Sequence, residues 1–263
     1  MGVRPILFLS DYGTEDEFVG ICHAVMARIA PAVRILDLSH GIPPGDVLRG
    51  GEVLREAVRH APEAAVYLAV VDPGVGTDRR GLALEAGSSF LVGPDNGLLV
   101  PAAEALGGTG AAVALEEPGA SPTFHGRDVF APAAASLAAG GMLEELGAVI
   151  DPSTLVPSPR LELVVDDSRV GCRVAAVDRY GNVQLDATPE SISSFGDAFH
   201  VRWRGGEMST SVVRTFADLP DGAPGLLVDS WGRLAIAVKG SSAATMLGLA
   251  PGDAVEIGPG SDR

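Results

Sequence analysis

The stretch that decides the fold is Val70-Val-Asp-Pro-Gly-Val-Gly-Thr-Asp-Arg-Arg80, which directly follows the apolar run from Ala64 to Ala69. A buried strand is predicted to end at Asp72, and the chain then passes through two glycines to two adjacent arginines. Open α/β sheets bind their ligands at the carboxyl ends of their strands. The stretch therefore predicts either a site that holds charge or a plain β-turn that Asp72 caps.

Strands and helices alternate on both sides of this stretch. We predict strands at 5–9, 33–36, 81–86, 90–92 and 111–115, and helices at 14–29, 46–60 and 95–106. Thr14 and Glu17 have the spacing of a capping box for the first helix. Asp128 is expected to cap an Ala-rich helix that reaches Ala139. The alternation predicts an α/β domain of three layers over residues 1–150, with a largely parallel sheet between the helices.

The second half of the chain has a different texture. Three prolines and no helical period mark residues 151–160 as a linker. Short β-rich runs separated by Gly, Pro and Asp turns follow at 169–178, 199–203, 225–228, 233–238 and 254–257. Residues 161–263 are therefore predicted to form a smaller all-β domain, either a barrel or a sandwich.

Composition excludes several classes of protein. The net charge of −15 repels phosphate backbones, so we expect no nucleic acid as a partner. No run approaches the roughly 18 apolar residues of a membrane span, and no signal peptide is apparent before Asp11. The two cysteines, Cys22 and Cys172, lie far apart without a Cys/His cluster, so neither a disulfide framework nor a zinc site is expected. These features favour a cytoplasmic protein.

Two nucleotide-binding motifs fail on spacing. Gly74-Val-Gly76 lacks a third glycine three positions on, where Arg79 stands, so the Rossmann fingerprint is absent. No Gly-Lys-Ser/Thr follows, which excludes a Walker loop. What remains is Asp72 beside Arg79 and Arg80, an acid whose neighbouring cations keep it ionised.

A histidine just before the Ala-rich helix is a second candidate. His125 stands in Thr123-Phe-His-Gly-Arg-Asp-Val-Phe130, near a helix N-terminus whose dipole favours the neutral imidazole. A neutral ring can act as a base or as an acceptor, and its loop belongs to the same sheet domain as Asp72. Arg127 and Asp128 are interpreted as a salt bridge beside a helix cap.

Three turns complete the candidate list. Asp11, after the first strand, is suited to accept the two hydroxyls of a ribose, or else forms an Asx turn. The segments 178–182 and 229–233 taken alone are typical of hairpin connections.

Six segments together resemble the S-adenosylmethionine hydroxide adenosyltransferases, adenosine-forming hydrolases related to the bacterial fluorinase and chlorinase. They are SDYGTED at 10–16, DPGVGTDRR at 72–80, PDNGLL at 94–99, FHGRDVFAP at 124–132, DRYGN at 178–182 and DSWG at 229–232. The resemblance implies an N-terminal α/β domain, a C-terminal β-barrel and a homotrimer. In such a trimer each active site lies between the first domain of one subunit and the second domain of its neighbour.

The resemblance also implies roles for individual residues. An Asp-Arg-His triad falls on Asp72, Arg79 and His125, where the halogenating relatives have tyrosines in place of the acid and the imidazole. The choice of Arg79 over Arg80 rests on the family pattern alone.

The implied substrate contacts divide by the part of the molecule they bind. Asp11 is implied to bind the ribose diol, and Asp16 with Asp178 the methionine ammonium. Asn182 is implied to bind the adenine and Ser230 the carboxylate. Trp231 and Val238 complete the substrate-binding set. Three positions depart from the relatives: Gly45 stands where an aromatic is common, Asp229 replaces an Asn, and Trp231 stands where halogenases use Arg.

The implied activity is hydrolysis of S-adenosyl-L-methionine to adenosine and L-methionine. A sulfonium is a good leaving group, so attack at C5′ requires a positioned water and a dry site, and we expect neither a metal nor a cofactor. Which member of the triad accepts the proton is left open. The alternatives are a chlorinase-like halogenase, an adenosine-binding protein without turnover, and, last, an NAD-linked dehydrogenase.

Overall fold

The protein is described from a computed structural model that covers residues 3–116, 118–159, 163–166 and 168–260. The chain divides into two compact units, residues 1–159 and residues 160–263. Nine residues of the predicted linker, 151–159, belong to the first unit. There Thr154 and the backbone N–H of Val156 bond to Arg80 and Asp95.

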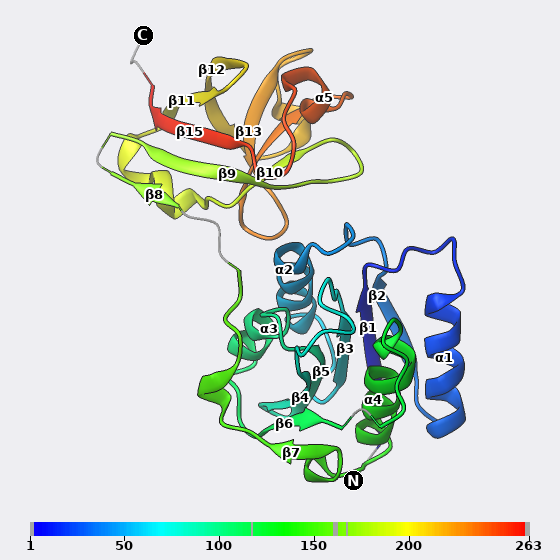
Figure 1. The fold of residues 1–263 in the computed structure, drawn as a ribbon. Helices are drawn as coiled ribbons and strands as arrows, with labels where there is room; N and C mark the ends of the chain where they lie inside the picture. The colour runs from blue at the N-terminus through cyan, green and yellow to red at the C-terminus, as the bar shows by residue number, and fades with distance from the viewer. Residues whose placement is uncertain (1–2, 117, 160–162, 167, 261–263) are drawn as a thin grey trace. The chain divides into compact units, whose positions relative to one another are not determined.

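A seven-stranded sheet in the order β2-β1-β3-β5-β4-β6-β7 forms the middle layer of the first unit (Figure 1). Its strands are β1 (Ile6–Ser10), β2 (Ile35–Ser39), β3 (Val66–Val70), β4 (Gly81–Ala86), β5 (Ser89–Pro94), β6 (Ala112–Leu115) and β7 (Gly147–Val149). The pairings among β2, β1, β3 and β5 are parallel, whereas β4 pairs antiparallel with β5 and β6, and β6 with β7. The sheet is therefore mixed, and the expectation of a largely parallel sheet is wrong. A two-residue turn joins β4 to β5, and such a turn can connect only antiparallel strands.

Helices cover both faces of this sheet, as the predicted three layers require (Figure 1). One face is covered by α1 (Phe18–Ile29) and α4 (Ala131–Ala138), and the other by α2 (Val47–Val58) and α3 (Val100–Ala105). The strand residues alternate between the two cores: Ile6 and Phe8 pack with α1 and α4, and Leu7 and Leu9 pack with α2 and α3. Among the described residues, no helix has both the length and the apolar character needed to cross a bilayer.

Two helix starts differ from the prediction. The first helix begins at Phe18 with Glu17 at its N-cap, and no side chain caps it, so the capping box of Thr14 and Glu17 is wrong. The third helix begins at Val100 rather than near Asp95, because Asn96 forms a turn there. The Asn96 amide donates to the carbonyl of Val71 and accepts the N–H of Leu98, which competes with helix formation.

The second unit contains a closed seven-stranded barrel. Its strands are β9 (Val170–Val177), β10 (Val183–Leu185), β11 (Ala198–Trp203), β12 (Gly206–Val213), β13 (Pro224–Val228), β14 (Leu234–Val238) and β15 (Ala254–Pro259). They pair in the order β9-β10-β14-β13-β12-β11-β15, and β15 returns to β9, which decides for a barrel over a sandwich. A short strand, β8 (Val164–Val165), adds to β9, and one helix, α5 (Ala243–Leu247), follows β14.

Candidate active site

The charged residues of the segment from Val70 to Arg80 lie along one edge of the sheet. Because β4 runs antiparallel to β3, the loop from Asp72 to Arg80 joins the carboxyl end of β3 to the start of β4 at the same edge of the sheet, past β5. Within this loop Gly76 has a φ of +77°, and a Cβ there would lie 2.4 Å from the carbonyl oxygen of Pro122. Glycine therefore permits the loop to pack against the segment that precedes His125.

The structure brings Asp72, Arg79 and His125 together. The Nε of Arg79 donates to both carboxylate oxygens of Asp72 at 3.0 Å, and its Nη2 donates to Oδ2 at 2.5 Å. The same Nη2 lies 2.8 Å from His125 Nδ1. The Asp72 and Arg79 side chains are only 6% and 9% exposed, and His125 is 4% exposed, so little water screens these contacts.

The arginine decides the tautomer of His125. A guanidinium stays protonated and can only donate, so Nδ1 of His125 must accept. A neutral imidazole with an acceptor at Nδ1 carries its proton on Nε2. Any exchange of a proton between His125 and a water molecule therefore goes through Nε2.

A π-turn, η1 (Gly126–Phe130), positions the imidazole and continues directly into α4. Such insertions of one residue into a helix are frequent at functional sites. Phe130 lies below the cluster, with its ring 5.1 Å from the Arg79 guanidinium and 6.5 Å from the His125 ring. The helical backbone begins upstream of Asp128, so the prediction that Asp128 caps the helix is wrong. Its predicted salt bridge with Arg127 is present, at 2.6 Å.

The two adjacent arginines have different hydrogen-bond partners. Arg80 turns away from the cluster and bonds Asp95 at 2.5 and 2.8 Å, together with the carbonyl oxygen of Thr154. Arg79 alone of the two contacts Asp72 and His125. The geometry thus distinguishes two residues that the sequence could not.

Asp11 lies at the same edge, directly after β1. Its Oδ2 accepts the backbone N–H of Gly45 at 2.8 Å, which places the Gly45 loop beside it. Burial raises the pKa of the Asp11 carboxyl, and the charge of Asp72 raises it further, while the Gly45 N–H opposes both. Asp16, by contrast, is exposed in the loop before α1.

Replacing Asp11 by Asn is expected to lower kcat/KM by about tenfold to a hundredfold. The variant loses the charge that is predicted to accept the ribose hydroxyls, and a hydrogen bond to a charged group contributes roughly 1.5–3 kcal/mol. The pKa of Asp11 is higher in the folded protein than in the unfolded chain, so the protein loses stability as the pH rises and the carboxyl ionises. Asn cannot ionise, so the variant does not lose this stability. We therefore expect a higher Tm at neutral pH, and loss of the acid limb of kcat/KM. Steady-state assays and thermal melts from pH 4 to 8 measure both; an unchanged acid limb in the variant would assign it to another group.

In the second unit, Asn182 and Val238 line a hollow of about 670 Å³ together with Tyr180 and Phe216. The Asp178 carboxylate accepts the N–H groups of Tyr180 and Asn182 and, at 2.7 Å, the Asn182 side-chain amide. A carboxylate only accepts, so this bond fixes the orientation of the amide, with Oδ1 on the side away from Asp178.

Ser230 and Trp231 lie elsewhere on the barrel. They occupy the turn before Leu234, where Asp229 accepts the Trp231 N–H, whereas Asn182 lies beside the Val238 end of the same strand. A strand of this length separates the two ends by about 13 Å. In this chain the predicted ammonium contact, Asp178, and the predicted carboxylate contact, Ser230, therefore lie toward opposite ends of β14.

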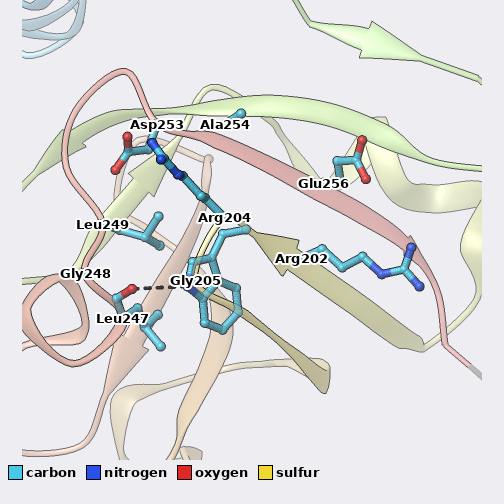
Figure 2. A pocket seen from close by; sticks show the side chains of 10 residues that line it. Arg202, Arg204, Gly205, Leu247, Gly248, Leu249, Asp253, Ala254 and Glu256 are labelled. Atoms are coloured by element: carbon cyan, nitrogen blue, oxygen red, sulfur yellow. Dashed lines mark hydrogen bonds between the residues drawn. The ribbon is translucent and has the colours of Figure 1, made fainter.

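A further hollow, of about 800 Å³, surrounds Trp203 and contains none of the predicted residues (Figure 2). The Trp203 indole donates to the carbonyl oxygen of Leu247 at 3.1 Å, the hydrogen bond drawn in Figure 2. Arg202 and Arg204 lie on its rim. It is distinct from the hollow that contains Asn182.

Sequence reasoning missed four aromatic residues of these sites. Tyr12 packs against Phe124, and burial is the main cause that raises the pKa of its phenol. Phe130 supports the triad, and Tyr180 and Phe216 border the Asn182 hollow. Tyr12, Phe130 and Tyr180 stand inside motifs already quoted, whereas Phe216 stands outside every motif and gave no signal.

The chain matches two family models over most of its length. Residues 6–147 match the SAM hydroxide adenosyltransferase N-terminal domain, and residues 172–256 match the C-terminal domain of the same family. The chain belongs to the SAM hydroxide adenosyltransferase family. The structure and the resemblance thus agree on the α/β domain followed by a barrel.

Relatives in this family are similar over nearly the whole chain. The (R)-S-adenosyl-L-methionine hydrolase of Salinispora arenicola is 48% identical, with 97% of this chain and 98% of that protein covered. The hydrolase of the same name from Thermus thermophilus is 41% identical over 97% and 100%. A fluorinase from Nocardia brasiliensis is 29% identical over 97% of each chain. A crystal structure of a conserved protein from Thermotoga maritima aligns with a TM-score of 0.85 at 34% identity, covering 96% of this chain and 99% of that one.

Proposed function

We propose that this protein hydrolyses S-adenosyl-L-methionine to adenosine and L-methionine. The observation that carries the proposal is the buried cluster of Asp72, Arg79 and His125, in a chain 41–48% identical to proteins named as (R)-S-adenosyl-L-methionine hydrolases. The acid and the imidazole occupy the positions where the halogenating relatives are expected to have tyrosines. This favours water over a halide as the nucleophile.

The cluster suits a displacement at the ribose C5′. A water oxygen forms a bond to C5′ while the C5′–S bond breaks, and methionine leaves as a neutral thioether. Positioning the water in line with that bond supplies much of the rate, because the leaving group needs no proton. One proton of the water leaves its oxygen as the C–O bond forms, and this proton ends in solvent.

The hydrogen bonds support a separate role for each residue of the triad. Arg79 engages Nδ1 of His125, so the ring presents Nε2–H and donates to the water oxygen. A carboxylate can accept hydrogen bonds on both of its oxygens, and Arg79 donates to both oxygens of Asp72. In this proposal Asp72 accepts a proton of the water as the C–O bond forms, while Arg79 fixes the acid and the ring relative to each other.

The barrel contributes the adenine contacts in this proposal. Asn182 accepts the exocyclic amino group through Oδ1, whose orientation Asp178 fixes. Tyr180 and Phe216 have exposed rings at the rim of the hollow, on which the adenine can stack. They would replace the aromatic residue that relatives commonly have at the position of Gly45. Ser230 and Trp231, at the far end of β14, remain the proposed contacts for the carboxylate of an extended substrate. The homotrimer with sites between subunits stays a prediction.

Untagged protein incubated with resolved R and S epimers of the substrate tests the proposal by chromatography of the products. We expect adenosine and methionine in equal amounts, with the R epimer preferred. His125→Ala is expected to lower kcat by about 10²- to 10⁴-fold, the range of a lost proton-transfer or orienting group. His60→Ala, an exposed histidine paired with Glu56, serves as the control and is expected to leave kcat unchanged.

Three results would contradict the proposal. No adenosine above the His125→Ala level, together with tight adenosine binding by calorimetry, indicates a binding protein without turnover. Formation of 5′-chloro-5′-deoxyadenosine in excess chloride indicates a halogenase. An unchanged kcat in His125→Ala removes the role assigned to the imidazole.

A further inference from the structure

A second cluster of ionisable side chains lies beside β1, apart from the triad. His23 of α1, Asp37 of β2 and His40, which follows β2, place their ligand atoms within 4.8 Å of one another. The Asp37 Oδ1 atom lies 2.8 Å from His23 Nε2 and 3.1 Å from His40 Nε2. Two imidazole nitrogens and one carboxylate oxygen therefore lie close together.

His40 is the buried member of the cluster and is aimed into it. The residue is 7% exposed, and its Nε2 forms no hydrogen bond of acceptable geometry, although Asp37 is close. The other ring nitrogen, Nδ1, lies 2.7 Å from the hydroxyl of the fully buried Ser10. When Nδ1–H donates to that hydroxyl, Nε2 carries a lone pair directed at the centre of the cluster. An outer hydrogen bond of this kind is typical of histidines that ligate metals.

We propose that His23, Asp37 and His40 bind one divalent transition-metal ion, of which Zn²⁺ is the reference. Imidazole nitrogens with a carboxylate oxygen suit Zn²⁺ and its neighbours in the first transition row, and not Ca²⁺ or Mg²⁺, which prefer oxygen alone. Around a tetrahedral Zn²⁺ the ligand atoms lie roughly 3.3 Å apart, from bond lengths of about 2.0–2.1 Å. The observed 2.8 and 3.1 Å are shorter than this spacing, and the three ligand atoms lie within 4.8 Å of one another, so the side chains have to separate slightly to admit the ion.

The cluster is buried on the His40 side and open to solvent on the side of His23 and Asp37, as an open metal site requires. The His23 and Asp37 side chains are 34% and 44% exposed, which provides an entry path and room for a water as the fourth ligand. A ring contact holds the buried side: the His40 ring lies edge-on to Phe8 at 4.7 Å.

The location of the ion predicts a role in stability. It would join α1 to β2, and through Ser10 it would reach the end of β1, directly before Asp11. The carbonyl oxygen of His40 also accepts the N–H of Gly13 at 2.8 Å. Metal binding is therefore expected to stiffen the segment that carries Asp11, without contact to the triad and without a part in the hydrolysis.

Metal binding by untagged protein, stripped with a chelator, tests this inference directly. Calorimetric titration with Zn²⁺ is expected to give one equivalent bound, and the visible spectrum of added Co²⁺ is expected to show a four-coordinate site. His23→Ala and Asp37→Asn are each expected to weaken Zn²⁺ binding by at least about tenfold. Both residues are partly exposed, so the variants are expected to fold, which circular dichroism checks.

His200→Ala is the matched control, because His200 pairs with Glu207 at 3.1 Å in the second unit but has no second imidazole in a described cluster. We expect His200→Ala to bind Zn²⁺ as the unaltered protein does. Zn²⁺ is expected to raise the Tm of these two proteins but not that of Asp37→Asn. Equal binding by all four proteins would place the ion elsewhere. No binding at micromolar Zn²⁺ would leave a hydrogen-bonded His-Asp-His network and overturn the proposal. Neither result depends on the hydrolase activity.

Discussion

Arg79→Lys is expected to lower kcat by at least about 10²-fold, whereas Arg80→Lys is expected to leave kcat within about twofold. Arg79 spans Asp72 and His125 with a planar fork of donors, and a lysine ammonium cannot donate to both in that geometry. Each charge-assisted bond that is lost contributes roughly 1.5–3 kcal/mol. The imidazole also loses the donor that fixes its tautomer.

The neighbouring residue makes this a matched comparison. Arg80 has the same chemistry and also pairs with a buried acid, Asp95, but its other partner is Thr154. Its replacement is expected to lower the Tm without changing the pH profile of kcat. Single-turnover assays over a pH series, with thermal melts of both variants, measure the two effects. If Arg80→Lys lost more activity than Arg79→Lys, the assignment of the triad would be wrong.

Gly126→Ala is expected to destabilise the protein by about 1–3 kcal/mol, the usual cost of forcing an extra methyl into a packed site. A Cβ at this position would lie 2.0 Å from the Tyr12 hydroxyl and 3.0 Å from its ring carbon. Relief requires the π-turn or Tyr12 to move, and His125 is the adjacent residue. Since a misplacement of about 1 Å can cost roughly 10²-fold in rate, we expect kcat to fall by more than tenfold.

A second substitution tests the cause. Tyr12→Phe removes the hydroxyl that the new methyl would meet, so the double variant is expected to recover part of the stability and activity lost by Gly126→Ala. Urea unfolding and steady-state kinetics of the four proteins form a double-mutant cycle. A cycle that is additive within error would show that the contact with Tyr12 is not the cause.

Much of the fold could be predicted because it follows from local periodicity. Continuous apolar runs in β1 and β3 indicate strands covered on both faces. The change to short β runs after residue 161 indicates the second, all-β unit. The antiparallel half of the first sheet could not be predicted in the same way. The apolar residues of β4 and β5 are compatible with either direction, and only the pairing geometry of their two-residue turn decides.

The candidate site divides similarly. Spacing and chemistry pointed to Asp72, His125, one of two arginines and Asp11, and the family resemblance added Asn182. The first four lie at the carboxyl edge of the sheet, and Asn182 lines the hollow of the barrel. Helix starts were less predictable, because Asn96 and the π-turn at Gly126 redirect the backbone through contacts with residues far along the chain.

By itself the sequence determined which chemical groups are present and the order in which strands end in charged residues, because both depend on neighbours along the chain. Tertiary structure alone decided which of them meet. Arg79 and Arg80 are adjacent and identical, yet one reaches His125 and the other Thr154, because consecutive residues point in different directions. His23, Asp37 and His40 match no metal motif, since α1 contributes the first, β2 the second and the loop after β2 the third. Only the packing of that helix against the sheet makes them neighbours.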